Sequence, residues 1–264
     1  MDKKYINIEE LKKIQLDILS DIADFCEENN IKYFLGYGTL IGAIRHKGYI
    51  PWDDDIDICM PRPDYDNFLK TYNNKRSIYK AIAFELDEDY KLPFAKVNDT
   101  RTIMWETMYG QDVFGVYIDV FPIDGCDKEG NLISHNIKLG QYLNAKKAIL
   151  GKTRSLRKNC IIAIGKCILA FTTIKSLLNK MQRASMVIPY ESAEYVANLM
   201  YPYGKCEIMR KVDLEETVFS DFEGRKFRIP KWYDKYLTQI YGNYMGLPPK
   251  DKRVSTHTFK AWWK

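Results

Sequence analysis

The feature that most constrains this chain is a dense acidic cluster at residues 53–57, Asp-Asp-Asp-Ile-Asp. Four carboxylates within five residues repel one another, so a folded chain keeps them together only where positive charge compensates them. Asp55 and Asp57 alternate with Ile56 and Ile58, and side chains two residues apart on a strand point to the same face. The pattern therefore predicts a strand that buries its isoleucines and presents Asp55 and Asp57 together.

The chemistry that this cluster predicts is metal-assisted phosphoryl or nucleotidyl transfer. Carboxylate oxygens are ligands that Mg²⁺ prefers, with Mn²⁺ as the alternative ion. A turn at Gly38 and Thr39 precedes the cluster, and its backbone N–H groups can hold phosphate. Asp55 and Asp57 are therefore the candidate metal ligands and catalytic residues.

A third carboxylate should come from a neighbouring strand, and Asp119 is the candidate. It is flanked by Ile118 and Val120 in an apolar run, where a charge is costly to bury unless it is paired or bound to a metal. The alternative is an aspartate at a strand end that caps a turn. Asp124, beside Gly125, fits ordinary turn chemistry.

The spacing of apolar residues predicts an α+β layout with a mixed sheet and flanking helices. Asn7 and Glu10 indicate the capped start of a first helix that ends near Asn29. Further helices are predicted over 39–46, 62–72, 131–150, 155–186 and 231–241. Strands are predicted over 31–35, 56–60, 79–85, 94–98, 102–106 and 113–121, and a hairpin joins 218–222 to 226–229 through a glycine turn.

Charge divides the chain more sharply than its net value of +5 indicates. Residues 130–190 contain eleven lysines and arginines and no aspartate or glutamate. We therefore expect a catalytic core at 1–130, a basic and mostly helical region at 131–215, and a C-terminal hairpin and helix at 216–264 that complete the catalytic domain. Such a split indicates an anionic partner for the basic region.

The apolar stretch 159–174 lies within this basic region. It is shorter than the roughly 20 apolar residues that a bilayer span needs. It fits equally well a helix on the surface of an anionic membrane and a buried core helix with solvated ends. The basic region shows little of the aromatic interleaving of single-strand binders, so no nucleic-acid partner is expected.

Cysteine usage and the N-terminus bear on the expected compartment. The six cysteines are scattered without a C-x-x-C pair, which is typical of neither a zinc site nor a disulfide framework. The N-terminus is charged and has no apolar run of a secretory signal. A cytoplasmic protein, with peripheral contact to the inner face of the cell membrane as the alternative, is the expectation.

The run GYGTLIGAIRHKGYIPWDDDIDICMPRPDYDNF (36–68) resembles the signature of the LicD family of phosphotransferases, relatives of the fukutin-related proteins within the nucleotidyltransferase-fold superfamily. The likeness continues through FAKVNDTRT (94–102), GVYIDVFPID (115–124) and the C-terminal segment 222–253. It covers both ends of the chain, and the helical middle is the least diagnostic part. One departure is a Gly-Thr turn where the superfamily has Gly-Gly or Gly-Ser.

The resemblance implies Mg²⁺-dependent transfer of phosphocholine from CDP-choline to a hydroxyl of a cell-surface glycan precursor, with release of CMP. Teichoic acid, lipopolysaccharide or capsule repeat units are the implied acceptors, in some cases lipid-linked. By position, Gly38 and Thr39 match the phosphate-binding turn, and Asp55, Asp57 and Asp119 match the metal ligands.

Further residues complete the expected site. Arg45, Lys96 and Arg101 are candidate cations for the nucleotide phosphates, against the alternative of solvated surface charges. Asp53 and Asp54 fit a supporting role behind the metal ligands or a solvated strand entry equally well. Candidates for an aromatic box around a quaternary ammonium are Trp52, Tyr37, Trp105 and Tyr109, and His46 and His257 are candidate phosphate contacts.

Rival functions remain open on the sequence alone. Within the same fold, the alternatives are a transferase for phosphoribitol or phosphoglycerol from another CDP-linked donor and a true nucleotidyltransferase. A more distant alternative is a non-enzymatic module that binds metal or nucleic acid. The acidic cluster lacks the D-x-D-x-D-G spacing of an EF-hand, which counts against that module.

Overall fold

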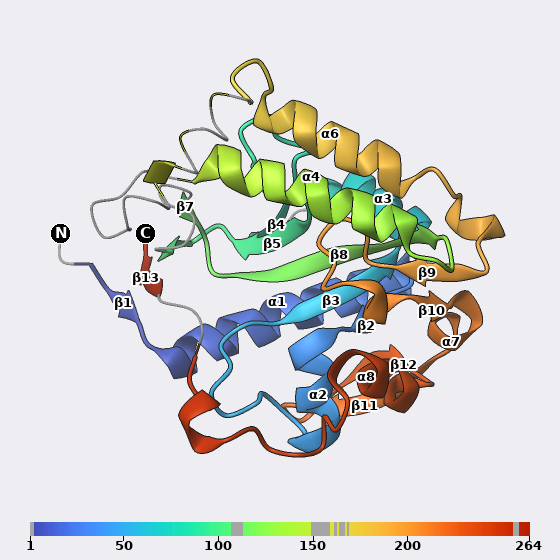
Figure 1. Cartoon of the computed structure of the whole chain (residues 1–264). Helices are drawn as coiled ribbons and strands as arrows, with labels where there is room; N and C mark the ends of the chain where they lie inside the picture. Colours follow the sequence, from blue (N-terminus) through green and yellow to red (C-terminus); the bar gives the residue numbers. More distant parts are fainter. Residues whose placement is uncertain are drawn as a thin grey trace.

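The strand that follows the acidic cluster, β3 (Asp57–Pro61), pairs in parallel with the long strand β8 (Tyr117–Cys126) inside a mixed sheet (Figure 1). The computed structural model describes residues 3–75, 77–106, 113–148, 159–160, 163, 167, 169–255 and 259–264. Within these residues, seven strands form the main sheet, and its other pairings are antiparallel. The remaining five are β2 (Phe34–Leu35), β4 (Tyr79–Ile82), β5 (Ala95–Asp99), β9 (Tyr195–Ala197) and β10 (Met209–Arg210). The expected α+β class with a mixed sheet is confirmed.

Two smaller sheets flank the main one. The first joins the two ends of the described chain, because β13 (Phe259–Trp263) pairs with both β1 (Tyr5–Ile6) and β6 (Thr102–Glu106). Strand β7 (Val113–Phe114) completes it. The second is the predicted hairpin, β11 (Thr217–Phe222) and β12 (Arg225–Pro230), turned at Glu223 and Gly224.

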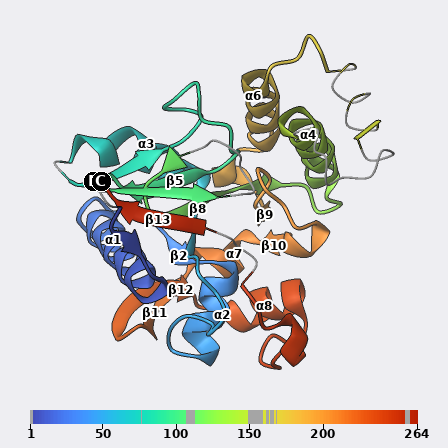
Figure 2. The same cartoon turned by 90° about the vertical axis from the view of Figure 1, so that its left-hand side faces the viewer.

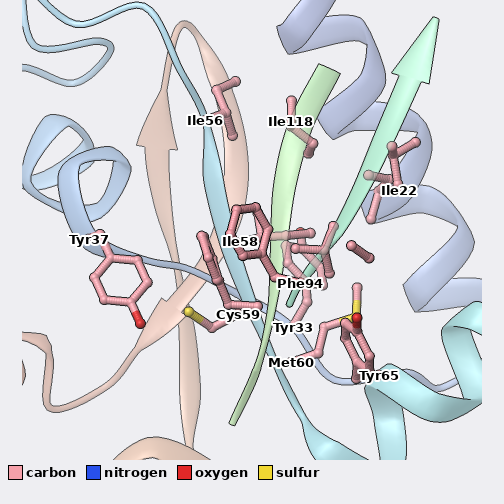
Figure 3. Packing of buried hydrophobic residues seen from close by; sticks show 14 of the residues in the cluster. Ile22, Tyr33, Tyr37, Ile56, Ile58, Cys59, Met60, Tyr65, Phe94 and Ile118 are labelled. Carbon is pink, nitrogen blue, oxygen red and sulfur yellow. The ribbon is translucent and has the colours of Figure 1, made fainter. Parts of the chain in front are cut away.

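Helix α1 (Ile8–Glu28) begins at the predicted cap, where the side chain of Asn7 accepts a hydrogen bond from the backbone N–H of Glu10 at 2.9 Å. Its apolar face packs against β5 and β8 (Figure 2). Figure 3 shows part of the resulting core, with Ile22 from α1, Ile58 from β3 and Ile118 from β8. Burying each such side chain contributes about 1.5–3 kcal/mol.

Five of the remaining helices correspond to predicted ones: α2 (Tyr37–Arg45), α3 (Arg62–Thr71), α4 (Asn131–Lys147), α6 (Ile174–Ser185) and α8 (Tyr233–Tyr241). The short helix α7 (Lys211–Glu215) was not predicted. Short 3-10 turns lie at Tyr72–Asn74, Tyr190–Ser192, Lys205–Glu207 and Lys250–Lys252. Helices α4 and α6 pack side by side above the sheet in Figure 1.

The structure corrects two of the predicted elements. The single strand expected over 113–121 is two strands in different sheets, because the chain passes at Gly115 close to the backbone carbonyl of Asp99. The helix predicted over 155–186 is interrupted: the described residues 159, 160, 163 and 167 are helical, a turn lies at 169–171, and α6 begins at Ile174, where the Thr173 side chain caps it. Most of 149–168 lies outside the described residues.

The basic region also contributes strands. β9 and β10 come from residues 131–215, where the sequence indicated helices, and β9 extends the main sheet alongside β8. The three-part division of the chain stays a prediction. Among the described helices, none has both the length and the apolar character needed to cross a bilayer.

Candidate active site

Strand register brings Asp57, Asp119 and Lys96 together on one face of the main sheet. Asp57 of β3 is the direct partner of Asp119 on β8, and Lys96 of β5 is the partner of Asp119 on its other side. Residues directly opposite each other in a sheet share a face. The Lys96 ammonium lies 2.6 Å from Asp119 Oδ1, and the Lys96 side chain is fully buried. Two of the three predicted metal ligands are therefore neighbours in the sheet, and one predicted cation, Lys96, contacts Asp119.

The electrostatics at Asp57 show that the acidic residues form one group. Burial, followed by the charges of Asp55, Asp119 and Asp53, raises the pKa of the Asp57 carboxyl well above its usual range, and Lys96 opposes the shift. Like charges this close cannot all stay ionised without a compensating cation. Carboxylates gathered in this way attract cations, so the group has the charge character of a cation site.

The segment just before β3 also brings carboxylates close together. One oxygen from each of Asp53, Asp54 and Asp55 lies within 4.8 Å of the others. Asp54 is the buried member, and it accepts a hydrogen bond from Ser255 Oγ at 2.8 Å. An all-oxygen set of this kind fits a hard divalent cation better than a transition metal with nitrogen or sulfur preference. The structure thus supports a metal site at this cluster without identifying the ion.

The glycine turn fixes the start of β3. Thr39 is buried at the beginning of α2, and its Oγ1 accepts a hydrogen bond from the Asp57 backbone N–H at 2.8 Å. A Cβ atom on Gly38 would lie 2.9 Å from Asp53 Oδ2, so glycine lets this carboxylate approach the helix start. Both residues therefore help to position the acidic cluster. Their contact with phosphate stays a prediction.

Tyr37, just before this turn, has a strained backbone. Its φ of 46° lies in the left-handed region, which is unfavourable for a residue with a bulky side chain. Buried contacts hold it there: its hydroxyl donates to Glu207 Oε2 at 2.8 Å and accepts from Asn198 Nδ2 at 2.9 Å. Burial raises the pKa of Glu207 to about 7. Strain of this kind concentrates at functional sites.

The other two predicted cations bind different groups. The Arg45 guanidinium donates to the backbone carbonyls of Tyr244 at 2.6 Å and Gly246 at 3.2 Å. The Arg101 guanidinium pairs with Asp99 at 2.6 Å. The structure thus brings Lys96 to the carboxylates and places Arg45 and Arg101 in contacts with other parts of the chain. Their roles in nucleotide binding stay predictions.

Asp124 is not the turn residue that its neighbouring glycine indicated. It lies within β8, is 1% exposed and forms a two-pronged ion pair with the buried Arg62, at 2.6 and 3.1 Å. The partner is 62 residues away in sequence, so local turn chemistry could not reveal it.

Among the described residues, the candidates for the aromatic box lie in different surroundings. Tyr37 is buried, Trp52 packs edge-on against His46, and Trp105 lies on β6 in another sheet. Tyr109 and His257 lie outside the described residues. Exposed tyrosines at 201, 203 and 241 lie near the carboxylates instead. Tyr201 and Tyr203 stand in a Tyr-Pro-Tyr-Gly run at 201–204, and nothing local to that run indicates that it folds beside the carboxylates.

A mixed sheet with a glycine turn, an aspartate on one strand and a second aspartate on its neighbour defines a nucleotidyltransferase-type domain. The sequence profile described as "LicD/FKTN/FKRP, nucleotidyltransferase domain" matches residues 30–144, which include both aspartates. The chain is also 30% identical over 271 residues to the lipopolysaccharide cholinephosphotransferase LicD of Haemophilus influenzae, covering 98% of this chain and 99% of that protein. The chain belongs to the LicD family, and the expected LicD-like phosphotransferase class is confirmed.

Two uncharacterized relatives share a shorter segment. A protein of Rickettsia typhi is 43% identical over 67 residues, 25% of this chain and 21% of that protein. A protein of Rickettsia prowazekii is 44% identical over 63 residues, 24% of this chain and 23% of that protein.

Proposed function

We propose that this protein transfers phosphocholine from CDP-choline to a hydroxyl of a cell-surface glycan precursor and releases CMP. The observation that carries the proposal is the similarity to a lipopolysaccharide cholinephosphotransferase over nearly the full length of both chains. The acidic group at β3 and β8 supports it, because carboxylates can hold the divalent cation that neutralises a donor with two linked phosphates.

Each residue of the proposed site has its own role in the transfer. Asp119 accepts the proton of the acceptor hydroxyl, and the hydroxyl oxygen attacks the phosphorus on the choline side. The bond from that phosphorus to the oxygen shared with the CMP phosphate breaks, and CMP leaves with the bonding electrons. Lys96, which contacts Asp119, offsets the negative charge that develops nearby.

The proposed ligands of a divalent cation, Mg²⁺ or alternatively Mn²⁺, are Asp55, Asp57 and Asp119, and Asp55 also belongs to the close set of Asp53, Asp54 and Asp55. When bound, the cation would neutralise the donor phosphates and the leaving group. Asp53 and Asp54 would help to orient these ligands without binding the cation themselves. Thr39 would keep Asp57 in register through the hydrogen bond to its backbone N–H.

The acceptor is proposed as a teichoic acid, lipopolysaccharide or capsule repeat unit. Two alternatives differ in the donor: phosphoribitol or phosphoglycerol could replace phosphocholine, or the nucleotide itself could be transferred. Incubation of the purified protein with Mg²⁺, each CDP-linked donor or CTP, and a panel of glycan fragments separates them. CMP formed in equal amount with a phosphocholine-bearing glycan supports the proposal. Release of pyrophosphate from CTP, or transfer from CDP-ribitol and not from CDP-choline, would contradict it.

A further inference from the structure

The face of the sheet that carries the carboxylates continues into aromatic residues. Phe121 stands two residues after Asp119 on β8, Phe94 stands two residues before Lys96, and the two rings are 4.5 Å apart. Tyr201 stacks on Phe121 at 6.3 Å and meets Phe94 edge-on at 5.2 Å. The sheet itself therefore places the Tyr201 ring beside the catalytic carboxylates.

Two further tyrosines continue this group of rings. The Tyr203 ring lies 5.4 Å from the ring of Tyr37, and the Tyr37 ring lies 5.4 Å from the ring of Phe121. The rings of Tyr203 and Tyr241 are 6.3 Å apart and inclined at 69°. All three tyrosines reach solvent, with 52% of Tyr201, 65% of Tyr203 and 37% of Tyr241 exposed.

Buried polar side chains hold the segment that carries Tyr201 and Tyr203. The Asn198 side chain accepts a hydrogen bond from the Tyr201 backbone N–H at 2.9 Å, and Glu207 accepts one from the Tyr203 backbone N–H. Both Asn198 and Glu207 also bond to the hydroxyl of Tyr37. The exposed rings thus stand on a fixed backbone, so little ordering is needed when a ligand binds.

We propose that Tyr201, Tyr203 and Tyr241 form the subsite for the quaternary ammonium group of the donor. This inference rests on the proposed function. A quaternary ammonium binds the faces of aromatic rings through cation–π attraction, and inclined rings suit a round cation. Two carbons link the ammonium to the phosphate ester in choline, so the cation has to bind next to the carboxylates.

The cytosine base is the competing occupant of these rings. A base sandwich favours parallel rings, whereas Tyr203 lies at 69° to Tyr241 and at 55° to Tyr37. The two occupants predict different responses to ring removal. Loss of an ammonium subsite lowers the affinity only for donors with a cationic head group. Loss of a binding surface for the base lowers the affinity for every CDP-linked compound.

Calorimetric titration of CDP-choline and of the uncharged-head donor CDP-glycerol, both with Mg²⁺, tests the proposal. Tyr203→Leu should lower the affinity for CDP-choline about 3- to 30-fold and should change the affinity for CDP-glycerol by less than about twofold. Tyr203→Phe keeps the ring and should bind CDP-choline within about twofold of wild type. Tyr142→Leu, at an exposed tyrosine on α4, is the matched control and should leave both affinities unchanged.

Three results would overturn the subsite. If Tyr203→Leu lowers the affinity for both donors equally, the rings bind the base and not the ammonium. If the affinity for CDP-choline is unchanged, the rings are not part of the donor site. Binding of neither donor to the wild-type protein would overturn the proposed function and the subsite together. A thermal unfolding curve for each variant confirms that the protein tested is folded.

Discussion

At the scale of single residues, Lys96 shows how one buried charge organises the site. Its ammonium has no exposed surface and contacts Asp119, which in turn is paired in register with Asp57. A lysine is almost never fully buried unless it is paired. The sequence predicted Lys96 as a candidate cation on the resemblance, but it gave no reason to expect that the side chain is buried against the third carboxylate.

Lys96→Met should destabilise the protein by about 3–5 kcal/mol, because it removes the buried ammonium that compensates the partly buried Asp119 carboxylate. Urea unfolding measures this change. Lys231→Met is the matched control, since Lys231 pairs with Glu216 at 2.7 Å on the surface, and its loss should cost less than about 1 kcal/mol. Equal effects of the two substitutions would contradict the assigned role of Lys96.

Glu207 should make stability depend on pH. Burial raises its pKa from 4.5 to about 7, so the folded state binds this proton more tightly than the unfolded state. The resulting stabilisation is fully present below pH 4.5 and is lost as the pH rises through about 7, by roughly 3 kcal/mol. Glu207→Gln should remove this part of the pH dependence. Parallel unfolding curves for both proteins at pH 5 and pH 8 provide the test, and an identical pH slope would refute it.

At the scale of elements, Gly115 separates two strands that form one continuous apolar run in the sequence. A Cβ atom there would lie 2.0 Å from the Asp99 backbone oxygen. Because strand propensity continues through 113–121, the sequence could not show where the chain leaves one sheet for the other. The short strands β9 and β10 escaped prediction for a related reason: they are three and two residues long and depend on pairing with distant segments.

Gly115→Ala should therefore destabilise the protein by about 1–3 kcal/mol, because backbone has to shift to admit the methyl group. Gly140→Ala in α4 is the contrasting substitution. Its nearest neighbour would be Met181 Cε at 3.9 Å, so the alanine should stabilise the helix by about 0.5–1 kcal/mol. Thermal unfolding of both variants measures whether each substitution lowers or raises the stability of the protein. A neutral Gly115→Ala variant would contradict the close approach.

Longer elements were predictable where local chemistry and burial agree. The cap at Asn7, the alternation before β3 and the glycine turn of the hairpin are all local signals, and the structure contains each element. The acidic cluster was predicted from the mutual repulsion and spacing of its carboxylates, and Asp119 was predicted because a charge in an apolar run is costly to bury. The tyrosines near the site were missed, since their proximity to Asp57 arises only when segments far apart in sequence fold together.

At the scale of the whole molecule, the uneven charge of the chain stays the basis for proposing a peripheral membrane contact. Helices α4 and α6 direct their apolar residues toward each other and the main sheet, while Lys180 and Arg183 are exposed. Each lysine or arginine near an anionic surface contributes about 1 kcal/mol.

Vesicles that contain anionic lipid should bind the protein at low salt and release it at high salt, in a sedimentation assay. The double variant Lys180→Glu, Arg183→Glu should bind more weakly, whereas the control Lys250→Glu, Lys252→Glu, at exposed lysines outside the basic region, should bind as the wild type does. Absence of binding to anionic vesicles at low salt would rule out the membrane contact.

The central claim is that the acidic group at β3 and β8 carries out the transfer, and Asp57→Asn tests it most directly. CMP release from CDP-choline with Mg²⁺ and an acceptor glycan is measured beside thermal unfolding. Activity should fall at least about 100-fold, because several kcal/mol of charge stabilisation are lost. The variant should be as stable as the wild type or more so, since an uncharged amide replaces a carboxylate surrounded by like charges. Activity within tenfold of the wild type in a folded Asp57→Asn protein would contradict the account.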